Sequence, residues 1–497
     1  MRWLLRLLLC LLGLCLFGCA RTAVPSSPAG SPSPDPYDES QMDFHPSPAV
    51  VRNDHPHTGP YWSGSAISPG PEVPALDPSP VKTLQLDVVD RIIDLAPGIK
   101  YHAWTFGGQV PGPIIHCRQG DLIKFSMTNR SNETLPAAPE LTSPMMHSMD
   151  FHAAMVSPDD KYRSIAPGQT IEFQFHVNYP GVFMYHCGTP MILEHLASGM
   201  YGMLIAEPRH AYPTKADKQY AIVQSEFYIK PTEKKVKVDG VPVYALDGAK
   251  VRLKESTYTV FNGVYNGFVA HPLTARPGDR VRLYVLNAGP SNTSSFHVVG
   301  TIFDRVWEDG NPDNQTRGRQ TVLLGSSCAT IVEFKVAEKG KYVMVDHHFA
   351  NASQGALGVI EAAEGPSPSG PIEHHNIPVS NVPTEALAAR GKMIYEQKCY
   401  ACHSIGKGVL IGPDLYGVTH RHPDKWTDDW LTSPDNMLAT DKTARELRAR
   451  FTIQMPNQGL TAQDRQAMIH FFHWIDSQPQ PGPEKPPPAQ SPGPAGP

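Results

Sequence analysis

Residues 182–200, VFMYHCGTPMILEHLASGM, carry the pattern from which the rest of the chain is interpreted. The run Val182–Tyr185 is apolar and β-branched or aromatic, which favours a buried strand. Cys187 follows this run closely, and His195 and Met200 come within one loop. A cysteine, two histidines and a weak methionine form the trigonal set, with a long axial thioether, that holds an electron-transfer copper. The stretch therefore predicts a copper site that needs one more histidine.

His186 cannot be that histidine, because it is the chain neighbour of Cys187. Neighbouring side chains of a strand point to opposite faces of the sheet, so these two residues cannot bind one metal ion. Two metal ions, one on each side of the strand and bridged by a single peptide unit, would use both residues.

A second segment, His147-Ser-Met-Asp150-Phe-His152, completes both sites by the same alternation. Asp150 and His152 are two residues apart and share a face, whereas His147 lies on the other face of a regular strand. A single histidine on an apolar strand is more often a core residue, but six matching residues in two segments favour metal binding. The first predicted site consists of His147, Cys187, His195 and Met200. The second predicted site begins with His152 and His186, with Asp150 beside them.

These segments resemble the first cupredoxin domain of a copper-containing nitrite reductase. The resemblance extends to a second cupredoxin domain and a fused c-type cytochrome, as in the three-domain members of that family. It implies a mainly β fold of two tandem cupredoxin domains, each a Greek-key β-sandwich, followed by an α-helical class I cytochrome c domain. In the family's terms, the site with Cys187 holds a type 1 copper and the site with His152 holds a type 2 copper.

Composition agrees with several exported domains. A chain of 497 residues is expected to form two to four domains, and a formal charge of −5 argues against general affinity for nucleic acid. The eight cysteines are few and scattered, which is not a disulfide framework. Cys117 and Cys328 have no metal, haem or leader role and are predicted to be small buried residues.

The N-terminus predicts export and membrane attachment. Residues 1–19 carry Arg2, Arg6 and a Leu-rich core, a pattern typical of a secretory signal and too short for a clear membrane span. The signal ends in Leu-Phe-Gly-Cys19, which resembles a lipoprotein box; ordinary signal cleavage nearby is the alternative. We expect a periplasmic protein anchored to the membrane by lipid on Cys19. Residues 20–80, rich in Pro, Ser, Asp and His, predict a disordered tether.

The first cupredoxin domain is predicted over residues 81–210, where alternating strands such as Ile171–Val177 are separated by Gly/Pro turns. The segment Thr105–Pro113 is similar to a sequence motif found across multicopper oxidases. The chain departs from two-domain nitrite reductases in the loop that follows Cys187, which is one residue shorter before its histidine. Glu194 stands where those enzymes carry a tryptophan.

The second cupredoxin domain, predicted over residues 211–363, repeats a turn and strand of the first. Gly278-Asp279 precedes a strand as Gly120-Asp121 does, which indicates internal duplication. The resemblance implies that His297 is the catalytic histidine and that Val299 is an apolar cap over the substrate.

The resemblance also implies that His347 is the third ligand of the type 2 copper. The choice between His347 and its neighbour His348 rests on the family pattern alone. A further family histidine, five residues after the catalytic one, is replaced by Ile302.

The C-terminal part predicts a haem protein. A linker over residues 364–383 precedes a cytochrome c domain over 384–478 and a Pro-rich tail over 479–497. A CxxCH motif in an exported chain attaches haem c through two thioethers, with its histidine as axial ligand. The predicted haem residues are Cys399, Cys402, His403 and, as sixth ligand, Met455, with Met437 as the alternative. Tyr395 is predicted to be a core aromatic residue of the first cytochrome helix.

Together these sites predict a reductase. Three histidines leave a copper with an open position, as in catalytic sites, and Asp150 and His297 could supply protons. The resemblance implies that nitrite becomes nitric oxide and water, with electrons passing from haem c through the type 1 copper. The donor would be a cytochrome, a cupredoxin or a quinol-linked chain. The resemblance also implies a homotrimer in which His347 completes the site of the neighbouring subunit.

Two other classes of protein are alternatives to a nitrite reductase. A laccase-like multicopper oxidase needs His-x-His pairs and a histidine on each side of the cysteine, but Gly188 and Thr189 follow Cys187. A non-catalytic copper and haem electron carrier would use the type 1 site and the haem. It would leave five residues unexplained: Asp150, His152, His186, His297 and His347.

Overall fold

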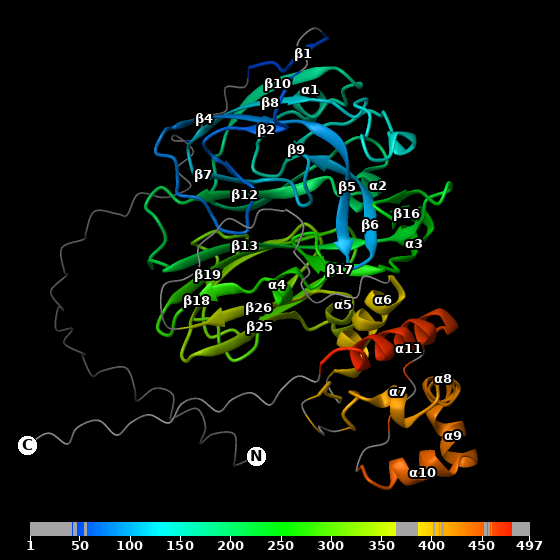
Figure 1. The fold of residues 1–497 in the computed structure, drawn as a ribbon. Helices are drawn as coiled ribbons and strands as arrows, with labels where there is room; N and C mark the ends of the chain where they lie inside the picture. Colours follow the sequence, from blue (N-terminus) through cyan, green and yellow to red (C-terminus); the bar gives the residue numbers. More distant parts are fainter. Residues whose placement is uncertain are drawn as a thin grey trace, which may run out of the picture. The chain divides into compact units, whose positions relative to one another are not determined.

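The structure is a computed structural model of the chain, and it combines β-sandwich domains with a helical C-terminal region (Figure 1). It describes residues 42, 47–53, 57–363, 386–400, 403–406, 408, 412–451, 455, 458 and 460–479. The predicted signal, the predicted lipidation site Cys19, the predicted haem cysteine Cys402 and the Pro-rich tail beyond residue 479 lie outside the described residues. Among the described helices, none is both long and apolar enough to cross a membrane.

The first cupredoxin domain consists of two five-stranded sheets with a core of aromatic residues between them. The strand orders are β1-β10-β8-β4-β2 and β3-β7-β12-β11-β9. Phe125, Phe151 and Phe173 are buried in this core, with ring centroids 5.0–6.3 Å apart. The strands are β1 (Val50–Arg52), β2 (Trp62–Ser63), β3 (Ile67–Ser68), β4 (Val81–Leu86), β7 (Ile114–Arg118), β8 (Leu122–Thr128), β9 (Asp150–Phe151), β10 (Thr170–His176), β11 (Gly181–His186) and β12 (Tyr201–Glu207).

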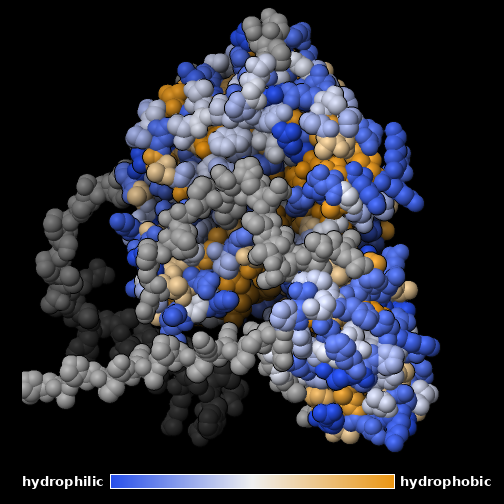
Figure 2. Space-filling model, in the orientation of Figure 1, coloured by the Kyte–Doolittle hydropathy of each residue, from blue (hydrophilic) through white to orange (hydrophobic). Residues whose placement is uncertain are grey.

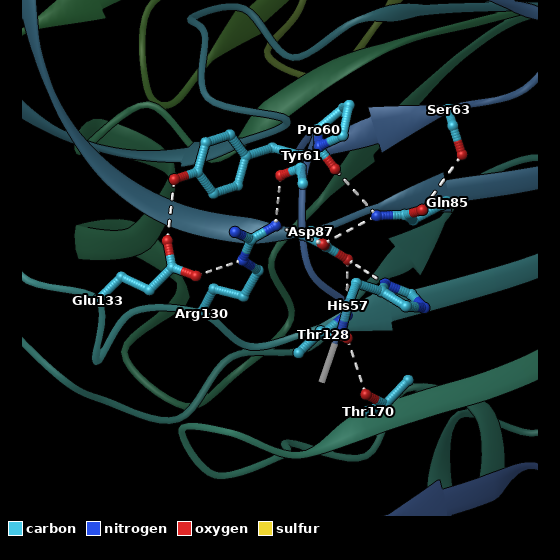
Figure 3. A network of polar contacts seen from close by, with 11 residues as sticks. His57, Pro60, Tyr61, Ser63, Gln85, Asp87, Thr128, Arg130, Glu133 and Thr170 are labelled. Carbon is cyan, nitrogen blue, oxygen red and sulfur yellow. Dashed lines mark hydrogen bonds and ion pairs between the residues drawn. The ribbon is translucent and has the colours of Figure 1, made fainter. Parts of the chain in front are cut away.

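The predicted tether over residues 20–80 is too long at its C-terminal end. Strands β1, β2 and β3 pair with β10, β4 and β7, so residues from 47 onward belong in part to the first cupredoxin domain. Figure 3 shows how the segment is held: the buried carboxylate of Asp87 lies 2.7 Å from Nδ1 of His57 and accepts a hydrogen bond from Arg130. The Arg130 guanidinium also lies 4.1 Å from the ring centroid of Tyr61. Composition alone missed this, because the contacts are made by residues distant in sequence.

The second cupredoxin domain has the same two-layer construction. Its sheets have the orders β17-β13-β19-β24-β21-β22 and β18-β26-β25-β20-β23. The strands are β13 (Lys218–Phe227), β17 (Tyr258–Phe261), β18 (Leu273–Ala275), β19 (Arg280–Gly289), β20 (Ser294–Val298), β21 (Arg305–Glu308), β22 (Gln315–Thr316), β23 (Thr321–Leu324), β24 (Ala329–Lys335), β25 (Gly340–Asp346) and β26 (Leu357–Ala362).

The two domains repeat one local design, which supports the predicted duplication. The β8 strand lies between an antiparallel and a parallel neighbour, and so does β19. In the turn before β8, the Asp121 carboxylate accepts a hydrogen bond from the backbone N–H of Arg118 at 2.9 Å. In the turn before β19, Asp279 accepts one from Arg276 at 2.8 Å.

A further sheet joins the two cupredoxin domains. Its order is β14-β16-β6-β5, with β15 also paired to β16. Because β16 of the second domain pairs in parallel with β6 of the first, the domains share backbone hydrogen bonds as well as side-chain contacts. The strands are β5 (Val88–Ala96), β6 (Ile99–Phe106), β14 (Ile229–Pro231), β15 (Lys237–Val238) and β16 (Val241–Leu246).

Short helices occupy the connections between strands. They are η2 (Pro139–Leu141), α1 (Pro158–Lys161), α2 (Ile192–Ala197), α3 (Gly248–Leu253), α4 (Gly267–Ala270) and α5 (Phe349–Ser353). The two unassigned cysteines differ: Cys117 is buried as predicted, whereas the prediction for Cys328 is wrong because its side chain is exposed. Cys328 lies in a turn, where its N–H donates to the carbonyl of Gly325, just before β24 begins.

The C-terminal region is helical and has its own apolar core. The helices are α6 (Ala386–Ile394), η3 (Tyr395–Cys399), α7 (Val418–Arg421), α8 (Asp424–Thr432), α9 (Pro434–Thr440), α10 (Lys442–Arg448) and α11 (Ala462–Asp476). Helices α6 and α11 cross closely at Gly391, where an added Cβ would lie 2.1 Å from the carbonyl oxygen of Ala467. The Tyr395 ring packs 5.7 Å from that of Phe471, so Tyr395 is a core residue of this region. The predicted fold class is confirmed.

Candidate metal centres

The first centre brings together His147, Cys187 and His195, whose ligand atoms all lie within 4.8 Å of one another. The Cys187 sulfur is 3.3 Å from Nδ1 of His195 and 3.9 Å from Nδ1 of His147. All three side chains are buried, as is that of Met200. The Met200 carbonyl accepts from the Cys187 N–H at 3.2 Å, so the loop closes back onto the strand.

A short helix, which the sequence did not reveal, positions His195. Cys187 follows the end of β11, and the chain then turns at Met191, which has a φ of 72°. Helix α2 follows this turn and carries His195 back to the cysteine. The Ser148 hydroxyl accepts from the N–H of Gly188 at 3.0 Å, which fixes the segment of His147 against the loop.

Burial prepares the two histidines of this centre for metal binding. It lowers the pKa of His147 to about 3, with a further contribution from His195. Burial also lowers the pKa of His195 to about 4. Both rings are therefore neutral near pH 7, the form in which imidazole binds metals. With a cysteine and a methionine, this closed donor set fits an electron-transfer copper.

Trp104 is a neighbour of this centre that the sequence analysis missed. Its ring centroid lies 5.1 Å from that of His195 and 6.0 Å from that of His147. Its backbone N–H donates to the carbonyl of Ser198 at 3.1 Å, which ties β6 to the end of the ligand loop. No local pattern marks Trp104, because the contact joins residues about ninety positions apart.

The second centre brings together Asp150, His152 and His186, again with ligand atoms within 4.8 Å of one another. The register of β9 and β11 places Asp150 opposite His186. The Nε2 atoms of the two histidines are 3.0 Å apart, and the Asp150 carboxylate lies 3.8 Å from Nε2 of His186. His186 is buried and His152 is exposed, so the centre is open to solvent on one side.

The hydrogen bond made by the His186 ring fits a metal ligand. Its Nδ1 donates to the carbonyl of Cys187 at 2.9 Å, so a neutral ring keeps a lone pair on Nε2, the atom that faces His152. Burial, and to a smaller degree His186, lowers the pKa of His152, whereas Asp150 acts in the opposite direction. Two imidazoles beside a carboxylate at an open site fit a catalytic copper.

His297 and His347 form a separate pair in the second cupredoxin domain. They lie on β20 and just after β25, and their rings stack with centroids 5.0 Å apart at 24°. His297 Nδ1 donates to the carbonyl of Gln320 on the chain before β23, which supports the ring although Ile302 replaces the family's second histidine. The Nδ1 of the neighbouring His348 donates to the carbonyl of Thr293 at 3.0 Å, and the choice of His347 as the ligand stays a prediction from the family pattern.

The second centre and the His297–His347 pair do not form one ligand group in the described part of the chain. Among the described residues, the ligand group around His152 does not include His347. Val299, the predicted cap, is 47% exposed and is therefore not covered within the chain. Among the described residues, the second centre and the His297–His347 pair are therefore two separate groups.

The surface over the first centre is apolar. Figure 2 shows hydrophobic side chains gathered near α2 on a face that is otherwise largely hydrophilic. Met191 and Ile192 are 68% and 44% exposed, and Leu253 of α3 is 66% exposed. Glu194, which replaces the family's tryptophan, is held by an ion pair of 2.8 Å with Arg252. The α2 helix thus presents apolar side chains to solvent while its inner side carries His195.

The helical region contains a cavity of about 590 Å³ that fits a haem. Cys399, His403 and Met455 all line it, whereas Met437 does not and is buried in α9.

His403 Nδ1 donates to the carbonyl of Pro413 at 2.8 Å, which leaves Nε2 as the ligand atom. An added Cβ at Gly412 would lie 2.5 Å from the His403 ring, so only glycine fits there. The Met455 sulfur accepts from the Trp430 indole at 3.1 Å.

Comparisons with known proteins identify both parts of the chain. The Cytochrome c family matches residues 388–476, and the Multicopper oxidase family matches residues 90–211. The copper-containing nitrite reductase of Neisseria meningitidis serogroup B is 38% identical over 306 residues, which cover 60% of this chain and 74% of that protein. The copper-containing nitrite reductase of Alcaligenes faecalis is 30% identical over 286 residues, which cover 54% and 72%.

Solved structures agree. The copper nitrite reductase from Nitrosomonas europaea is 34% identical with a TM-score of 0.51, and the match covers 59% of this chain and 97% of that one. The Cu-containing nitrite reductase from Thermus scotoductus is 30% identical with a TM-score of 0.51, covering 61% and 67%. The family and the cytochrome c match support copper and haem c as the cofactors. The chain belongs to the copper-containing nitrite reductase family.

Proposed function

We propose that this reductase converts nitrite to nitric oxide at a type 2 copper, with electrons delivered from haem c through a type 1 copper. The observation that carries the proposal is the position of His186 and Cys187 on opposite sides of one strand end, each within a different ligand group. A site closed to solvent and a site open to solvent are thereby joined by one peptide unit. When bound, the two coppers and the haem would supply the one-electron chemistry.

The link between the centres has a second component. The imidazole of His186 donates to the carbonyl of its neighbour Cys187 at 2.9 Å, in addition to the covalent connection. This hydrogen bond fixes the ring relative to the strand and shortens the bonded path between the two ligand groups. It supports electron transfer from the buried centre to the open one.

Asp150 and His297 are proposed to handle the two protons of the reaction. Asp150 is partly exposed and lies beside His186 without being needed as a ligand, so it can hold a proton near a bound anion. The Nδ1 of His297 donates to the carbonyl of Gln320, so its Nε2 can take up a proton and pass it to the substrate. Val299 would form the apolar wall over the substrate.

The separation of the second centre from the His297–His347 pair within the chain supports a homotrimer. We propose that His347 of one subunit binds the type 2 copper held by His152 and His186 of its neighbour. The proposal accounts for the exposure of His152 and Val299, and for the stacking of His297 on His347 at a surface. An assembled trimer would cover these side chains.

The position of the protein in the cell is also a proposal. A lipid on Cys19 would hold the protein at the membrane on the periplasmic side, where haem c is attached. In the proposed electron path, the electron-donor protein, either a cytochrome or a cupredoxin, would reduce haem c. The apolar surface of Met191, Ile192 and Leu253 beside His195 would favour short-lived contact with the apolar face of the redox domain that passes electrons to the type 1 copper. A quinol-linked chain is the other possible source of electrons.

An anaerobic assay tests the proposed function. The copper- and haem-loaded protein is given nitrite and a small artificial reductant, and nitric oxide is followed with an electrode. We expect steady formation of one nitric oxide per electron consumed. Ammonium as the product, or no consumption of nitrite by protein shown to contain both coppers, would contradict the proposal. Oxygen consumption with phenolic donors would instead indicate a multicopper oxidase.

A further inference from the structure

Asp346 is a buried acid that lies directly before His347, at the end of β25. Its side chain is 0% exposed. Among the described residues it forms no ion pair, and all of its hydrogen-bond donors are neutral. One carboxylate oxygen accepts from the backbone N–H groups of Ser295 at 2.8 Å and His348 at 3.0 Å. The other accepts from the side-chain amides of Gln224 and Asn351, both at 2.8 Å.

These four donors come from three different parts of the domain. Ser295 lies on β20 of the five-stranded sheet, and Gln224 lies on β13 of the six-stranded sheet. His348 caps the N-terminus of α5, and Asn351 belongs to that helix. Asp346 therefore connects both sheets of the second cupredoxin domain to the helix that follows the predicted copper ligand.

His347 lies inside this arrangement. Its backbone N–H donates to the carbonyl of Ser295 at 2.9 Å. The residue before it is Asp346 itself, and the residue after it, His348, donates its backbone N–H to the Asp346 carboxylate. Its imidazole stacks on His297, two residues beyond Ser295 on the same strand. The carboxylate thus fixes the backbone from which both imidazoles project.

A carboxylate suits this position for a physical reason. An ionised carboxylate only accepts hydrogen bonds and has about four acceptor sites, which equals the number of donors here. Hydrogen bonds to a charged group are stronger than neutral ones and offset the cost of burial. Because its oxygens are occupied and inaccessible, Asp346 is not itself a copper ligand.

We infer that Asp346 is a positioning residue for the type 2 copper, which holds His347 in the orientation needed to bind the metal in the neighbouring subunit. The inference rests on the proposed function. Without the carboxylate, four donors would be left unpaired and the chain around His347 could adopt other conformations. Supporting residues of this kind commonly contribute 10–100-fold to metal affinity.

Asparagine provides a conservative replacement. In Asp346→Asn, one oxygen still accepts from Ser295 and His348, and the new amide group can donate where the second oxygen stood. The amides of Gln224 and Asn351 can rotate to accept from it, because the Ser294 hydroxyl, which donates to the oxygen of Gln224 at 2.8 Å, can also reverse its role. Alanine offers none of these contacts.

The test compares Asp346→Ala and Asp346→Asn with wild type in the full-length protein. Copper per subunit is measured by mass spectrometry, and the two copper types are resolved by electron paramagnetic resonance during titration against a competing chelator. For Asp346→Ala we expect about 10–100-fold weaker binding of the type 2 copper, with the type 1 copper and its charge-transfer band unchanged. Asp346→Asn should recover affinity to within about threefold of wild type.

Glu333→Gln is the matched control. Glu333 is also a fully buried acid of the second cupredoxin domain, but it pairs with Arg282 on the six-stranded sheet. The control should lower the melting temperature while keeping both coppers. If Asp346→Ala does not fold, Asn351→Ala removes a single donor to the same carboxylate and should weaken type 2 copper binding in the same direction.

Three results would overturn the inference. They are full type 2 copper affinity in Asp346→Ala, equal loss in Asp346→Asn and Asp346→Ala, or equal loss in Glu333→Gln. A wild-type protein that never binds a type 2 copper would overturn the proposed function and, with it, this role of Asp346. Wild type with two coppers and nitrite reduction would leave the proposed function standing whatever the Asp346 variants do.

Discussion

His186 and Cys187 are neighbours in the chain, yet their side chains belong to two different ligand groups, one open to solvent and one buried. Successive side chains of a strand point to opposite faces of the sheet, and this alternation separates the two groups without any special backbone geometry. The two groups can therefore be altered independently, although only one peptide unit lies between them.

Replacing His152 tests this independence. His152→Ala removes a ligand atom that lies 3.0 Å from His186, so we expect loss of the type 2 copper and of nitrite reduction. The type 1 ligands come from the other face, so the charge-transfer band of the Cys187–copper bond should keep its position and intensity. Copper content should fall from two to one per subunit. Loss of the charge-transfer band in this variant would contradict the assignment of faces.

Asp150→Asn separates proton transfer from metal binding. The carboxylate lies 3.8 Å from His186, and the amide preserves its shape while removing its ability to hold and release a proton. We expect both coppers to remain and kcat to fall about 10²–10⁴-fold, the usual contribution of a general acid or base. Steady-state kinetics with an artificial reductant, together with copper analysis, provides the measurement. Wild-type turnover in Asp150→Asn would remove this residue from the mechanism.

Trp104 should matter only to the type 1 centre. Its ring packs on both His195 and His147, so truncation would loosen the imidazoles and admit water beside them. In Trp104→Ala we expect a shifted or weakened charge-transfer band and faster loss of the type 1 copper, with the type 2 signal unchanged. Trp104→Phe, which keeps an aromatic face, is the control and should remain close to wild type. An unchanged spectrum in both variants would show that the contact has no effect on the copper.

The strand pattern and the site residues were predictable to different degrees. The faces of His186, Cys187, Asp150 and His152 follow from a local period of two, so the sequence sufficed. The roles of His297 and His347 came from family resemblance, because nothing local distinguishes them from other histidines. Helix α2, the Trp104 contacts and the ordered segment around Tyr61 were missed, because each depends on contacts between residues far apart in the chain.

Without copper, the first centre should make stability depend on pH. Burial lowers the pKa of His147 to about 3 and that of His195 to about 4, below the usual value of 6.5. The unfolded chain therefore binds more protons than the folded chain between these values, so the free energy of unfolding falls as the pH drops below about 6.5. Each histidine contributes at most about 1.4 kcal/mol per pH unit in that range.

Urea unfolding of copper-free protein from pH 7.5 to pH 5 measures this slope. His147→Leu is the matched control, because it removes one titrating group from the buried centre and should make the slope shallower. A free energy of unfolding that is constant over this range, or that rises as the pH falls, would contradict the assignment of these two histidines as buried and neutral.

The cytochrome c domain is expected to supply electrons and to take no part in nitrite binding. Every residue assigned to the substrate or to copper lies before residue 348, whereas the haem cavity is lined by residues from Cys399 onward. A tethered donor acts at an effective concentration that is commonly in the mM range for short flexible linkers, which replaces a slower bimolecular encounter. A chain stopped at Gly370 should therefore bind two coppers and reduce nitrite with a small artificial reductant at the wild-type rate. With a protein donor that delivers electrons to the haem, the same truncated chain should be much slower than the full-length protein.

In the full-length protein, rapid mixing of the fully reduced form with nitrite should oxidise the haem within the first turnovers. A haem that stays reduced through many turnovers, or a truncated chain that contains both coppers but is inactive with the artificial reductant, would contradict this division of roles.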